Sequence, residues 1–185
     1  MNIAIVGAAG MVGSQLVSLA KSRGHEVIAL DKESGTDVTA PEGLAEALAG
    51  AEAMVDVTQS PSLSEEDATA FFTRAAENLG KAAAEARVRR YVVLSIIGVD
   101  KIAAAETEPG TGSDGYFRAK FAHEQATLAF APGPHVVRSA QFHDIARQAI
   151  RRPPCDAPRA KGRGTPRSRA RSSSGTCRCP STATP

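Results

Sequence analysis

Short apolar runs alternate with longer segments of helical periodicity along the first 140 residues of the chain. Apolar runs of strand type occupy residues 2–6, 26–30, 53–57, 91–96 and 135–138, and Asp37-Val38 predicts a further, very short strand. Helices are predicted over residues 11–23, 41–49 and 116–130. A further, long helix is predicted to begin at a capping box formed by Ser62 and Glu65 and to end at Glu85. This regular alternation is typical of an α/β protein with a doubly wound parallel sheet.

Charge divides the chain into two segments of opposite sign. Residues 1–150 carry 13 Lys and Arg against 19 Asp and Glu, a net charge of −6, whereas residues 151–185 carry 9 against 1, a net charge of +8. The 185 residues suffice for one domain with a sizeable core. We therefore expect one mildly acidic domain over residues 1–150, without the basic surface that nucleic-acid binding requires.

Residues 151–185 have a composition that does not support a folded core. They are rich in Arg, Pro and Ser, lack apolar periodicity and contain all three cysteines. We expect a disordered basic C-terminal tail that forms no domain. The abrupt change after Ile150 fits GC-rich DNA read out of frame, so the tail is interpreted as a frameshift product. An ordinary disordered tail, or an arm that binds nucleic acid or a membrane surface, are the alternatives.

Other features narrow the class of protein. The Cys177-Arg-Cys179 spacing does not match a zinc site, and no metal is expected. The sequence has no run of 18 apolar residues, as a transmembrane helix would need, and its first residues do not resemble a signal peptide. We expect a cytoplasmic protein with no membrane partner, and the sequence leaves its oligomeric state open.

Glycines follow the first predicted strand at the positions that a dinucleotide-binding loop needs. Gly7, Gly10 and Gly13 stand between Val6 and the first predicted helix. The first lets the chain turn off the strand, the second lets backbone N–H groups approach a pyrophosphate, and the third lets the helix lie close to the sheet. The positive N-terminus of that helix would face the phosphates. The pattern predicts a Rossmann-like fold that binds a dinucleotide, and an ordinary strand-to-helix turn is the alternative.

The residues after the second predicted strand bear on the choice of cofactor. Asp31 lies 18 residues after Gly13, where a carboxylate accepts both ribose hydroxyls and repels a 2′-phosphate, which favours NAD over NADP. Lys32 could instead hold that phosphate, and both residues could be solvated turn residues. Asp37 and Val38 could contact the adenine edge, with an ordinary turn aspartate as the alternative.

Two further sets of polar residues complete the candidate chemistry. Thr58 and Gln59 follow the fourth predicted strand, at the edge where a nucleotide would lie. Tyr116 and Lys120 share one face of a predicted helix, because residues four apart do so. A nearby ammonium and an oxidised nicotinamide favour the phenolate, which would make the tyrosine a useful acid–base group. A surface tyrosine lying over a lysine stem is the alternative.

Taken together, these motifs resemble the short-chain dehydrogenase/reductase superfamily. The likeness covers about residues 1–150 and looks most like the atypical, NmrA-like NAD(P)H-binding branch, whose bacterial members are often described as sugar epimerases or oxidoreductases. The motifs that carry it are Gly7-x-x-Gly10-x-x-Gly13, Asp37-Val38, Asn78-Leu79, Leu94-Ser95-Ile96-Ile97-Gly98, Tyr116-x-x-x-Lys120 and Arg138-Ser-Ala-Gln-Phe142-His143.

The resemblance implies an NAD(P)-dependent oxidoreductase that acts on a small carbonyl, quinone or related compound. A non-catalytic NAD(P)H-binding redox sensor, or an inactive gene fragment, is the alternative. Tyr116 would be the general acid/base, Lys120 its electrostatic partner and a ribose ligand, and Ser95 an assisting hydroxyl. Gln141 and His143 would contact substrate. The dinucleotide contacts would come from Gly7, Ala9, Gly10, Met11, Val12, Gly13, Asp31, Lys32, Asp37, Val38, Thr58, Gln59 and Lys120.

The chain departs from the superfamily pattern in two places. In extended members the catalytic hydroxyl usually lies two positions beyond Ser95, where Ile97 stands in this sequence. Ser95 would then act from a shifted position, or simply bond its own backbone as a strand-tip serine. The basic tail stands where the substrate-binding region is expected, and His143 could be a solvent-facing residue at a helix start.

Overall fold

The computed structural model describes residues 1–104 and 114–140. Contacts divide the chain into two units, Met1–Ile145 and Ala146–Pro185, and the second lies outside the described residues. The predicted tail and the predicted substrate contacts Gln141 and His143 also lie outside them. The first unit therefore carries the fold and every site residue described below.

Five parallel strands form one sheet in the order β2-β1-β3-β4-β5. Strand order reverses between β1 and β3, because β2 lies on one side of β1 and all later strands lie on the other. In sheets of this kind ligands bind at the carboxyl edge, beside such a switch point. The strands are β1 (Asn2–Val6), β2 (Glu26–Leu30), β3 (Ala53–Asp56), β4 (Arg90–Ile96) and β5 (Pro134–Ser139).

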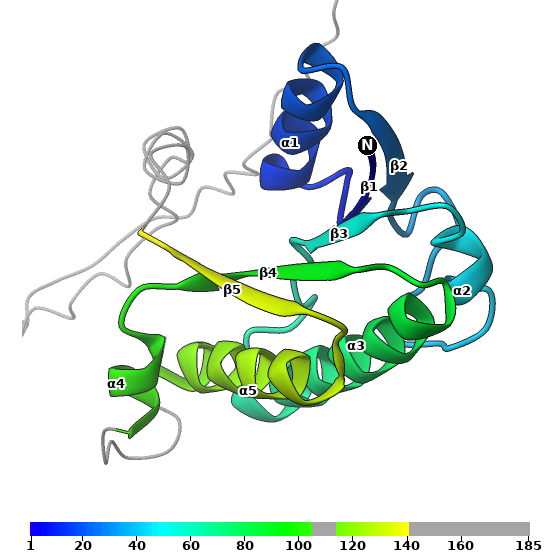
Figure 1. Cartoon of the computed structure of the whole chain (residues 1–185). Helices are drawn as coiled ribbons and strands as arrows, with labels where there is room; N and C mark the ends of the chain where they lie inside the picture. Colours follow the sequence, from blue (N-terminus) through cyan, green and yellow to red (C-terminus); the bar gives the residue numbers. More distant parts are fainter. Residues whose placement is uncertain (105–113, 141–185) are drawn as a thin grey trace, which may run out of the picture. The chain divides into compact units, whose positions relative to one another are not determined.

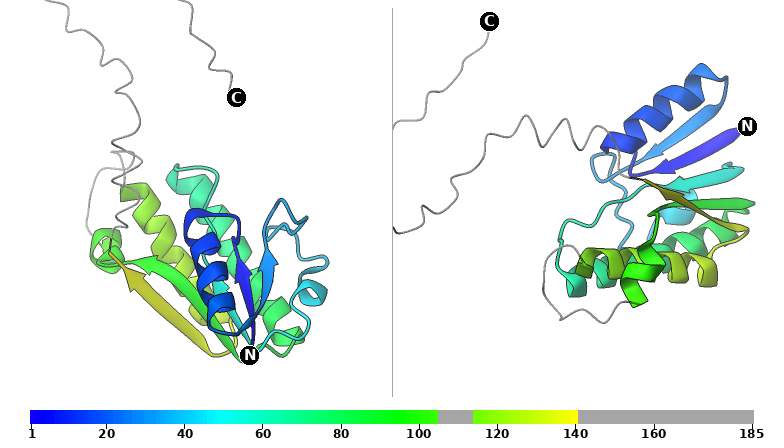
Figure 2. Two further views of the ribbon diagram at one scale, coloured as in Figure 1. Left: turned by 90° about the horizontal axis from the view of Figure 1, so that it is seen from above. Right: turned by 90° about the vertical axis from the view of Figure 1, so that its left-hand side faces the viewer.

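Helices lie on both faces of the sheet, as Figures 1 and 2 show, so the predicted doubly wound α/β fold is confirmed. The helix α1 covers one face and the helices α3 and α5 lie side by side on the other. Along the part of the chain that the structure describes, no helix is long and apolar enough to cross a membrane. The helices are α1 (Met11–Ser22), α2 (Leu44–Ala47), α3 (Glu65–Glu85), α4 (Val99–Ala104) and α5 (Asp114–Phe130).

The main core lies between the sheet and α3. Strand residues that alternate toward this face, such as Ala4, Met54 and Tyr91, pack with Leu79 of α3. The two long helices approach each other closely, because a Cβ on Gly80 would lie 2.8 Å from the backbone carbonyl carbon of Phe130. Small side chains on α3 thus bring α5 close enough for its inner face to reach the sheet.

The predicted strand at Asp37-Val38 was wrong, since this dipeptide lies in a turn and the sheet has five described strands. The Asp37 carboxylate accepts hydrogen bonds from the Thr39 backbone N–H (2.9 Å) and from the Thr39 hydroxyl (2.7 Å). Such local side-chain bonds compete with a strand ladder. Val38 is buried in the core, and its carbonyl accepts a hydrogen bond from the Asn78 amide at 3.1 Å. Val38 is therefore apolar because it packs in the core, although it does not pair with any described strand of the sheet.

Helix boundaries also differ from the predicted ones. The helix predicted over residues 41–49 is only α2, because Gly43 at its N-cap has a φ of 76°, in the left-handed region. The cap of α3 is Ser64, whose hydroxyl accepts from the Asp67 N–H at 3.2 Å, so the predicted box of Ser62 and Glu65 was displaced by two residues. The short helix α4 was not predicted.

Candidate active site

The glycine loop joins β1 to α1 at the carboxyl edge of the sheet. Gly7 has a φ of 86°, and a Cβ there would lie 3.0 Å from the carbonyl oxygen of Val57. A Cβ on Gly13 would overlap the carbonyl oxygen of Gly7, so only glycine allows α1 to pass this close to the loop. A Cβ on Gly10 would meet that same oxygen at 3.2 Å. The loop is therefore compact because its three glycines lack side chains.

The N-terminus of α1 opens directly from this loop. Gly10 is the N-cap residue and has no side chain to accept hydrogen bonds from the first turn. Ala9 is exposed, whereas Met11 and Val12, the first helical residues, are half-buried. No acidic residue stands in this first turn, so the positive end of the helix dipole faces outward without a carboxylate of the turn beside it.

Asp31 follows β2 directly and closes a tight turn. Its Oδ1 accepts a hydrogen bond from the Ser34 N–H at 2.7 Å, and its backbone carbonyl accepts one from the Ser34 hydroxyl at 2.8 Å. Lys32 is exposed in the same turn. The structure therefore gives Asp31 a turn-forming role, at the position where the sequence predicts a ribose ligand.

The segment after β3 brings a polar residue to the predicted acid–base group. The Asp56 carboxylate accepts from both the N–H (2.9 Å) and the hydroxyl (2.7 Å) of Thr58, which fixes a turn at the end of the strand. The next residue, Gln59, accepts a hydrogen bond from the Tyr116 hydroxyl at 3.0 Å. Two predicted site segments that lie far apart in sequence thus meet at one place.

Tyr116 and Lys120 lie on α5 and both contact the ring of Phe72 on α3. The Tyr116 ring packs edge-on against Phe72, with centroids 6.0 Å apart, and the Lys120 Nζ lies 4.5 Å from the Phe72 centroid. Burial raises the pKa of Tyr116, and the hydrogen bond to Gln59 offsets this only in part. Without a cofactor, the phenol therefore carries its proton at neutral pH.

Lys120 is 5% exposed, and its ammonium belongs to a buried polar cluster. We call this the Asp56 cluster; its members are Asp56, Thr58, Tyr91, Lys120 and His123. The Lys120 Nζ lies 3.0 Å from the His123 Nδ1, and the His123 Nε2 lies 3.1 Å from the Asp56 Oδ2. The Tyr91 hydroxyl donates to the same Oδ2 at 2.8 Å. Both carboxylate oxygens of Asp56 are therefore engaged.

Charge in the Asp56 cluster follows from burial and hydrogen bonding. Burial alone would raise the pKa of Asp56, but His123 and the two bonds from Thr58 outweigh it and hold that pKa well below its usual range. Burial lowers the pKa of His123, with the Lys120 charge acting in the same direction. Burial also lowers the pKa of Lys120, to about 8, against the attraction of Asp56 and Glu124. At neutral pH the cluster thus holds an ammonium, a neutral imidazole and a carboxylate.

Ser95 lies on β4, on the face that packs against α5. It is 3% exposed, and its hydroxyl has no hydrogen-bond partner within residues 1–104 and 114–140. The alternative in which this hydroxyl bonds its own backbone is therefore not observed. Ile97, where extended superfamily members place the hydroxyl, is 61% exposed.

An ion pair between the exposed Arg138 and the buried Glu124 ties α5 to β5. The guanidinium of Arg138 donates to the buried carboxylate of Glu124 through Nε (3.0 Å) and Nη2 (2.8 Å), a bidentate geometry. The Asp100 carboxylate also contacts Arg138, at 3.2 Å. These contacts position the helix that carries Tyr116 and Lys120.

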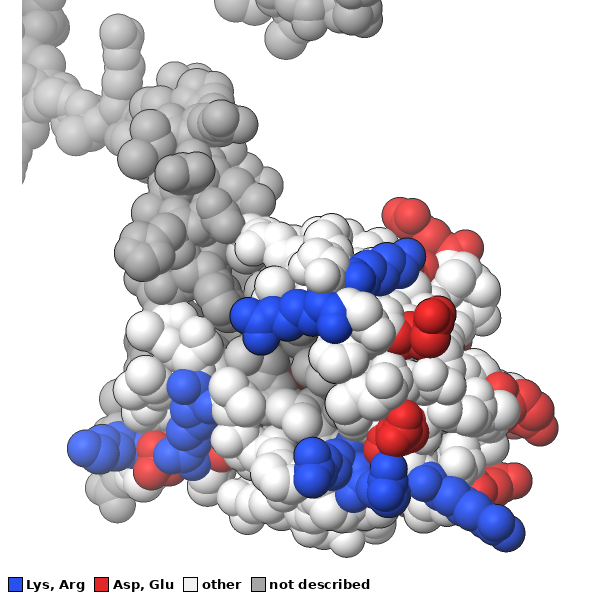
Figure 3. Space-filling model, turned by 45° about the horizontal axis from the view of Figure 1, so that its top comes forward, with Lys and Arg blue, Asp and Glu red and all other residues white. Residues whose placement is uncertain are grey.

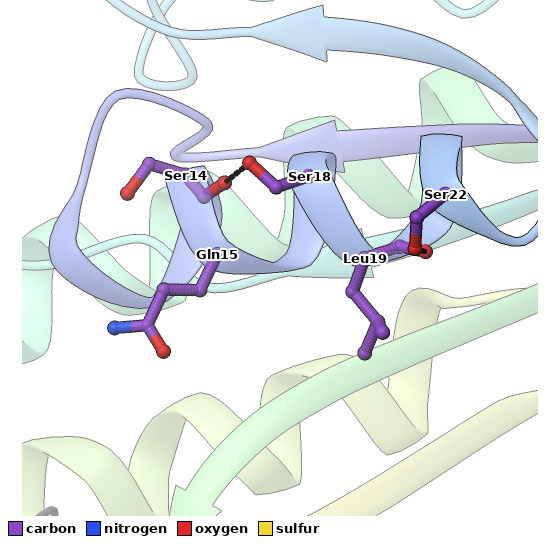
Figure 4. Close-up of a pocket in the computed structure, with 5 residues that line it drawn as sticks. All are labelled: Ser14, Gln15, Ser18, Leu19 and Ser22. Carbon is purple, nitrogen blue, oxygen red and sulfur yellow. Dashed lines mark hydrogen bonds between the residues drawn. The ribbon is translucent and has the colours of Figure 1, made fainter.

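The surface offers less specific features. A hollow of about 570 Å³ runs along α1, and Figure 4 shows Gln15 and Leu19 pointing away from β2 beside a row of serines. None of the predicted site residues lines it; its lining residues are Ser14, Gln15, Ser18, Leu19 and Ser22. On the face drawn in Figure 3, Lys and Arg are interspersed with Asp and Glu, so that face carries no continuous basic patch among the described residues.

Comparison with known proteins decides the family. The model of the NAD dependent epimerase/dehydratase family matches residues 3–135. The chain belongs to this family. The dTDP-4-dehydrorhamnose reductase of Mycolicibacterium smegmatis is 34% identical over 148 residues, which cover 75% of this chain and 45% of the reductase. The predicted resemblance is thus confirmed at the level of the family.

Solved structures of other proteins share the fold of this family member. A dTDP-4-dehydrorhamnose reductase from Clostridium acetobutylicum gives a TM-score of 0.59 at 21% identity, covering 75% of this chain and 52% of the reductase. The Bordetella bronchiseptica enzyme WbmG, in complex with NAD, gives the same TM-score, identity and coverage. At this identity the likeness shows the fold, and the chain spans about half the length of these relatives.

The sequence analysis of this family member did not identify Asp56 and His123 as residues of the candidate active site. Asp56 lies inside the strand predicted over residues 53–57 and ends the observed β3, where a buried carboxylate is unusual and calls for partners. His123 lies three residues after Lys120, on the same face of the helix, together with the buried Ala119 and Ala126. That spacing could have placed His123 beside the lysine, although nothing in the local sequence identifies Asp56 as its partner.

Proposed function

We propose that this chain is an NAD(P)-dependent oxidoreductase that binds the dinucleotide at the glycine loop. The observation that carries the proposal is the shared location of that loop and the Tyr116 segment. Val57 packs against Gly7, and two residues later Gln59 accepts the Tyr116 hydrogen bond. A cofactor seated on the loop would therefore extend along the end of β3 toward Tyr116.

The residues present fit a dinucleotide. The backbone at Gly7 and Gly13 leaves no room for side chains, so the loop gives a pyrophosphate access to main-chain groups and to the N-terminus of α1. Ser95 offers a buried hydroxyl without a described partner, as expected for a group whose partner arrives with a ligand. Ala9, Met11 and Val12 would line the same loop, and Thr58 would lie beside the dinucleotide at the end of β3.

Each polar residue then has a defined task. A nicotinamide dinucleotide supplies or accepts a hydride when bound. Tyr116, protonated because burial raises its pKa, would donate a proton to the substrate oxygen during reduction and take it back during oxidation. Lys120 would bind the ribose and bear its charge near the phenol, and Ser95 would donate a hydrogen bond to the substrate oxygen.

Only a few residues bear on the cofactor preference and on the choice of substrate. Asp31 would accept the adenosine ribose hydroxyls and so favour NAD over NADP, with Lys32 reducing the margin. Asp37 and Val38 would lie at the adenine end. The substrate would be a small carbonyl, quinone or related compound, and Gln141 and His143 would contact it. The relatives named as dTDP-4-dehydrorhamnose reductases make a keto-sugar nucleotide one carbonyl compound to test.

Turnover with Tyr116→Phe tests the proposal. The full chain is mixed with NADH and a panel of quinones, aldehydes and keto-sugar nucleotides, and NADH oxidation is followed by absorbance. Because Tyr116→Phe removes a general acid, it should lower kcat by about 10²–10⁴-fold. Gln125→Ala, exposed on the same helix, serves as the control. NADH binding without turnover would favour the sensor instead, and full activity in Tyr116→Phe would reject the acid–base role.

A further inference from the structure

The two halves of the proposed acid–base pair are both tied to one buried carboxylate. On one side Asp56 holds Thr58, and the following residue Gln59 accepts the Tyr116 hydrogen bond. On the other side Asp56 holds His123, which contacts the Lys120 ammonium. We propose that Asp56 and His123 are positioning residues for Tyr116 and Lys120. This inference rests on the proposed function above.

Hydrogen bonding fixes the tautomer of His123. An ionised Asp56 only accepts hydrogen bonds, so the imidazole proton lies on the Nε2 that faces it. The Nδ1 is then an acceptor, and the Lys120 ammonium, which only donates, is its complement at 3.0 Å. Asp56 thus sets the histidine tautomer that can hold the lysine.

Packing leaves the imidazole little freedom. The ring of Phe72 stacks on His123, with centroids 4.7 Å apart and an interplanar angle of 18°. The same ring lies 4.5 Å from the Lys120 Nζ, so one side chain of α3 supports both residues. The charged or titratable groups that face His123 are Asp56 on β3, with Tyr91 of β4 bonded to it, and Lys120 and Glu124 on its own helix.

The arrangement has a consequence for the ammonium. A lysine on α5 at this position could bend along the apolar surface of Phe72 or extend to solvent, and its amine must be held to contact a ribose or a phenol. His123 gives the buried ammonium an acceptor that carries no charge of its own. It therefore holds Lys120 in place without neutralising the charge that the proposed chemistry uses.

Two replacements separate positioning from simple packing. His123→Phe keeps a ring against Phe72 and removes both nitrogens. Asp56→Asn is isosteric, and its amide would donate to the His123 Nε2, which moves the proton to Nδ1 and leaves the Lys120 ammonium without an acceptor. His123→Gln is the conservative variant, because its amide can donate to Asp56 and accept from Lys120. His135→Gln, an exposed histidine on β5, is the matched control.

The first measurement is independent of any cofactor. NMR of 13Cε-labelled lysine gives the pKa of Lys120, assigned by the signal that Lys120→Met removes, and 15N shifts of the imidazole give the His123 tautomer. We expect a lysine pKa of about 8 in the parent chain. It should move by about one unit or more in His123→Phe and Asp56→Asn, but stay near 8 in His123→Gln and His135→Gln. An unchanged Lys120 pKa in the first two variants would overturn the inference.

The second measurement links the Asp56 cluster to the proposed function. Calorimetric titration with NADH should show a Kd raised about tenfold or more in His123→Phe and in Lys120→Met, as for loss of a charge-assisted hydrogen bond. The double variant should bind no more weakly than Lys120→Met alone, because both changes remove one interaction. Equal NADH affinity of His123→Phe and the parent would overturn the positioning role. Absence of NADH binding by the parent would instead refute the proposed function, and the NMR result would decide the role of the cluster.

Discussion

The two halves of the candidate site are built by different physical means. Around β1 and α1 the site is made of backbone, and its shape depends on side chains that Gly7 and Gly13 lack. Around β3 and α5 it is made of buried polar side chains, with Asp56 joined to Tyr91 and His123 from distant parts of the chain. The first half needs neighbouring residues of one type, whereas the second needs particular pairs that only the fold brings together.

This difference predicts which substitutions lower the free energy of unfolding most. Asp56→Ala would leave the Tyr91 hydroxyl and the His123 imidazole buried without their acceptor, and should lower the free energy of unfolding by about 3–5 kcal/mol. Urea unfolding followed by circular dichroism measures this. Glu77→Ala, which breaks the exposed pair with Lys81, is the matched control and should cost about 0.5 kcal/mol or less. Equal losses in the two variants would show that the Asp56 cluster contributes no more than a surface ion pair.

The same difference explains what the sequence could predict. The glycine loop was found because its three glycines lie within seven residues of each other, after an apolar strand, and each has a known backbone role. Asp37-Val38 misled because an apolar residue after a turn reads as a strand, while the Asp37 hydrogen bonds to Thr39 favour a turn. Local hydrogen bonding of this kind is poorly encoded in a pattern of apolar positions.

Side chains that meet only in the folded protein were harder to predict. The Tyr116 and Lys120 pair could be recognised from its spacing on one helix, but not the contact of that lysine with His123. Asp56 and His123 are 67 residues apart, and no local rule links them. The sequence therefore predicts the candidate site residues that lie close together in the chain, on one helix face or in one loop. It misses those that meet only through contacts between distant parts of the chain.

Within the glycine loop, Gly13 and Gly10 should respond differently to the same change. Gly13→Ala places a Cβ on the Gly7 carbonyl oxygen, so α1 must shift, and we expect a loss of about 1–3 kcal/mol in unfolding free energy. Gly10 has a φ of −67°, which alanine adopts freely, and a Cβ there would meet the Gly7 carbonyl oxygen at 3.2 Å, so Gly10→Ala should cost about 1 kcal/mol through this tight contact and a poorer N-cap. Urea unfolding of both variants compares them, and the opposite order would contradict the packing role given to Gly13.

The turn after β2 gives the smallest expected effect. Asp31→Ala should reduce the preference for NAD over NADP by about 1–2 kcal/mol, as for loss of one charged hydrogen bond. Asp31→Asn keeps an acceptor for the Ser34 N–H and so separates the carboxylate charge from the turn. Calorimetric titrations with both cofactors provide the ratio, with Glu33→Ala in the same exposed turn as the control. An unchanged ratio in Asp31→Ala would assign this residue to the turn alone.

Titration of the full chain with NADH, with and without Gly10→Ala, tests the central claim most directly. A methyl group at residue 10 would stand at the N-cap of α1, where the pyrophosphate would approach, and we expect it to cost the fold only about 1 kcal/mol. We predict saturable binding of one NADH per chain by calorimetry, lost or weakened at least tenfold in Gly10→Ala and unchanged in Ser18→Ala, which alters an exposed residue farther along the same helix. Equal NADH affinity in the parent and Gly10→Ala, or no saturable binding at all, would contradict a dinucleotide site on the glycine loop.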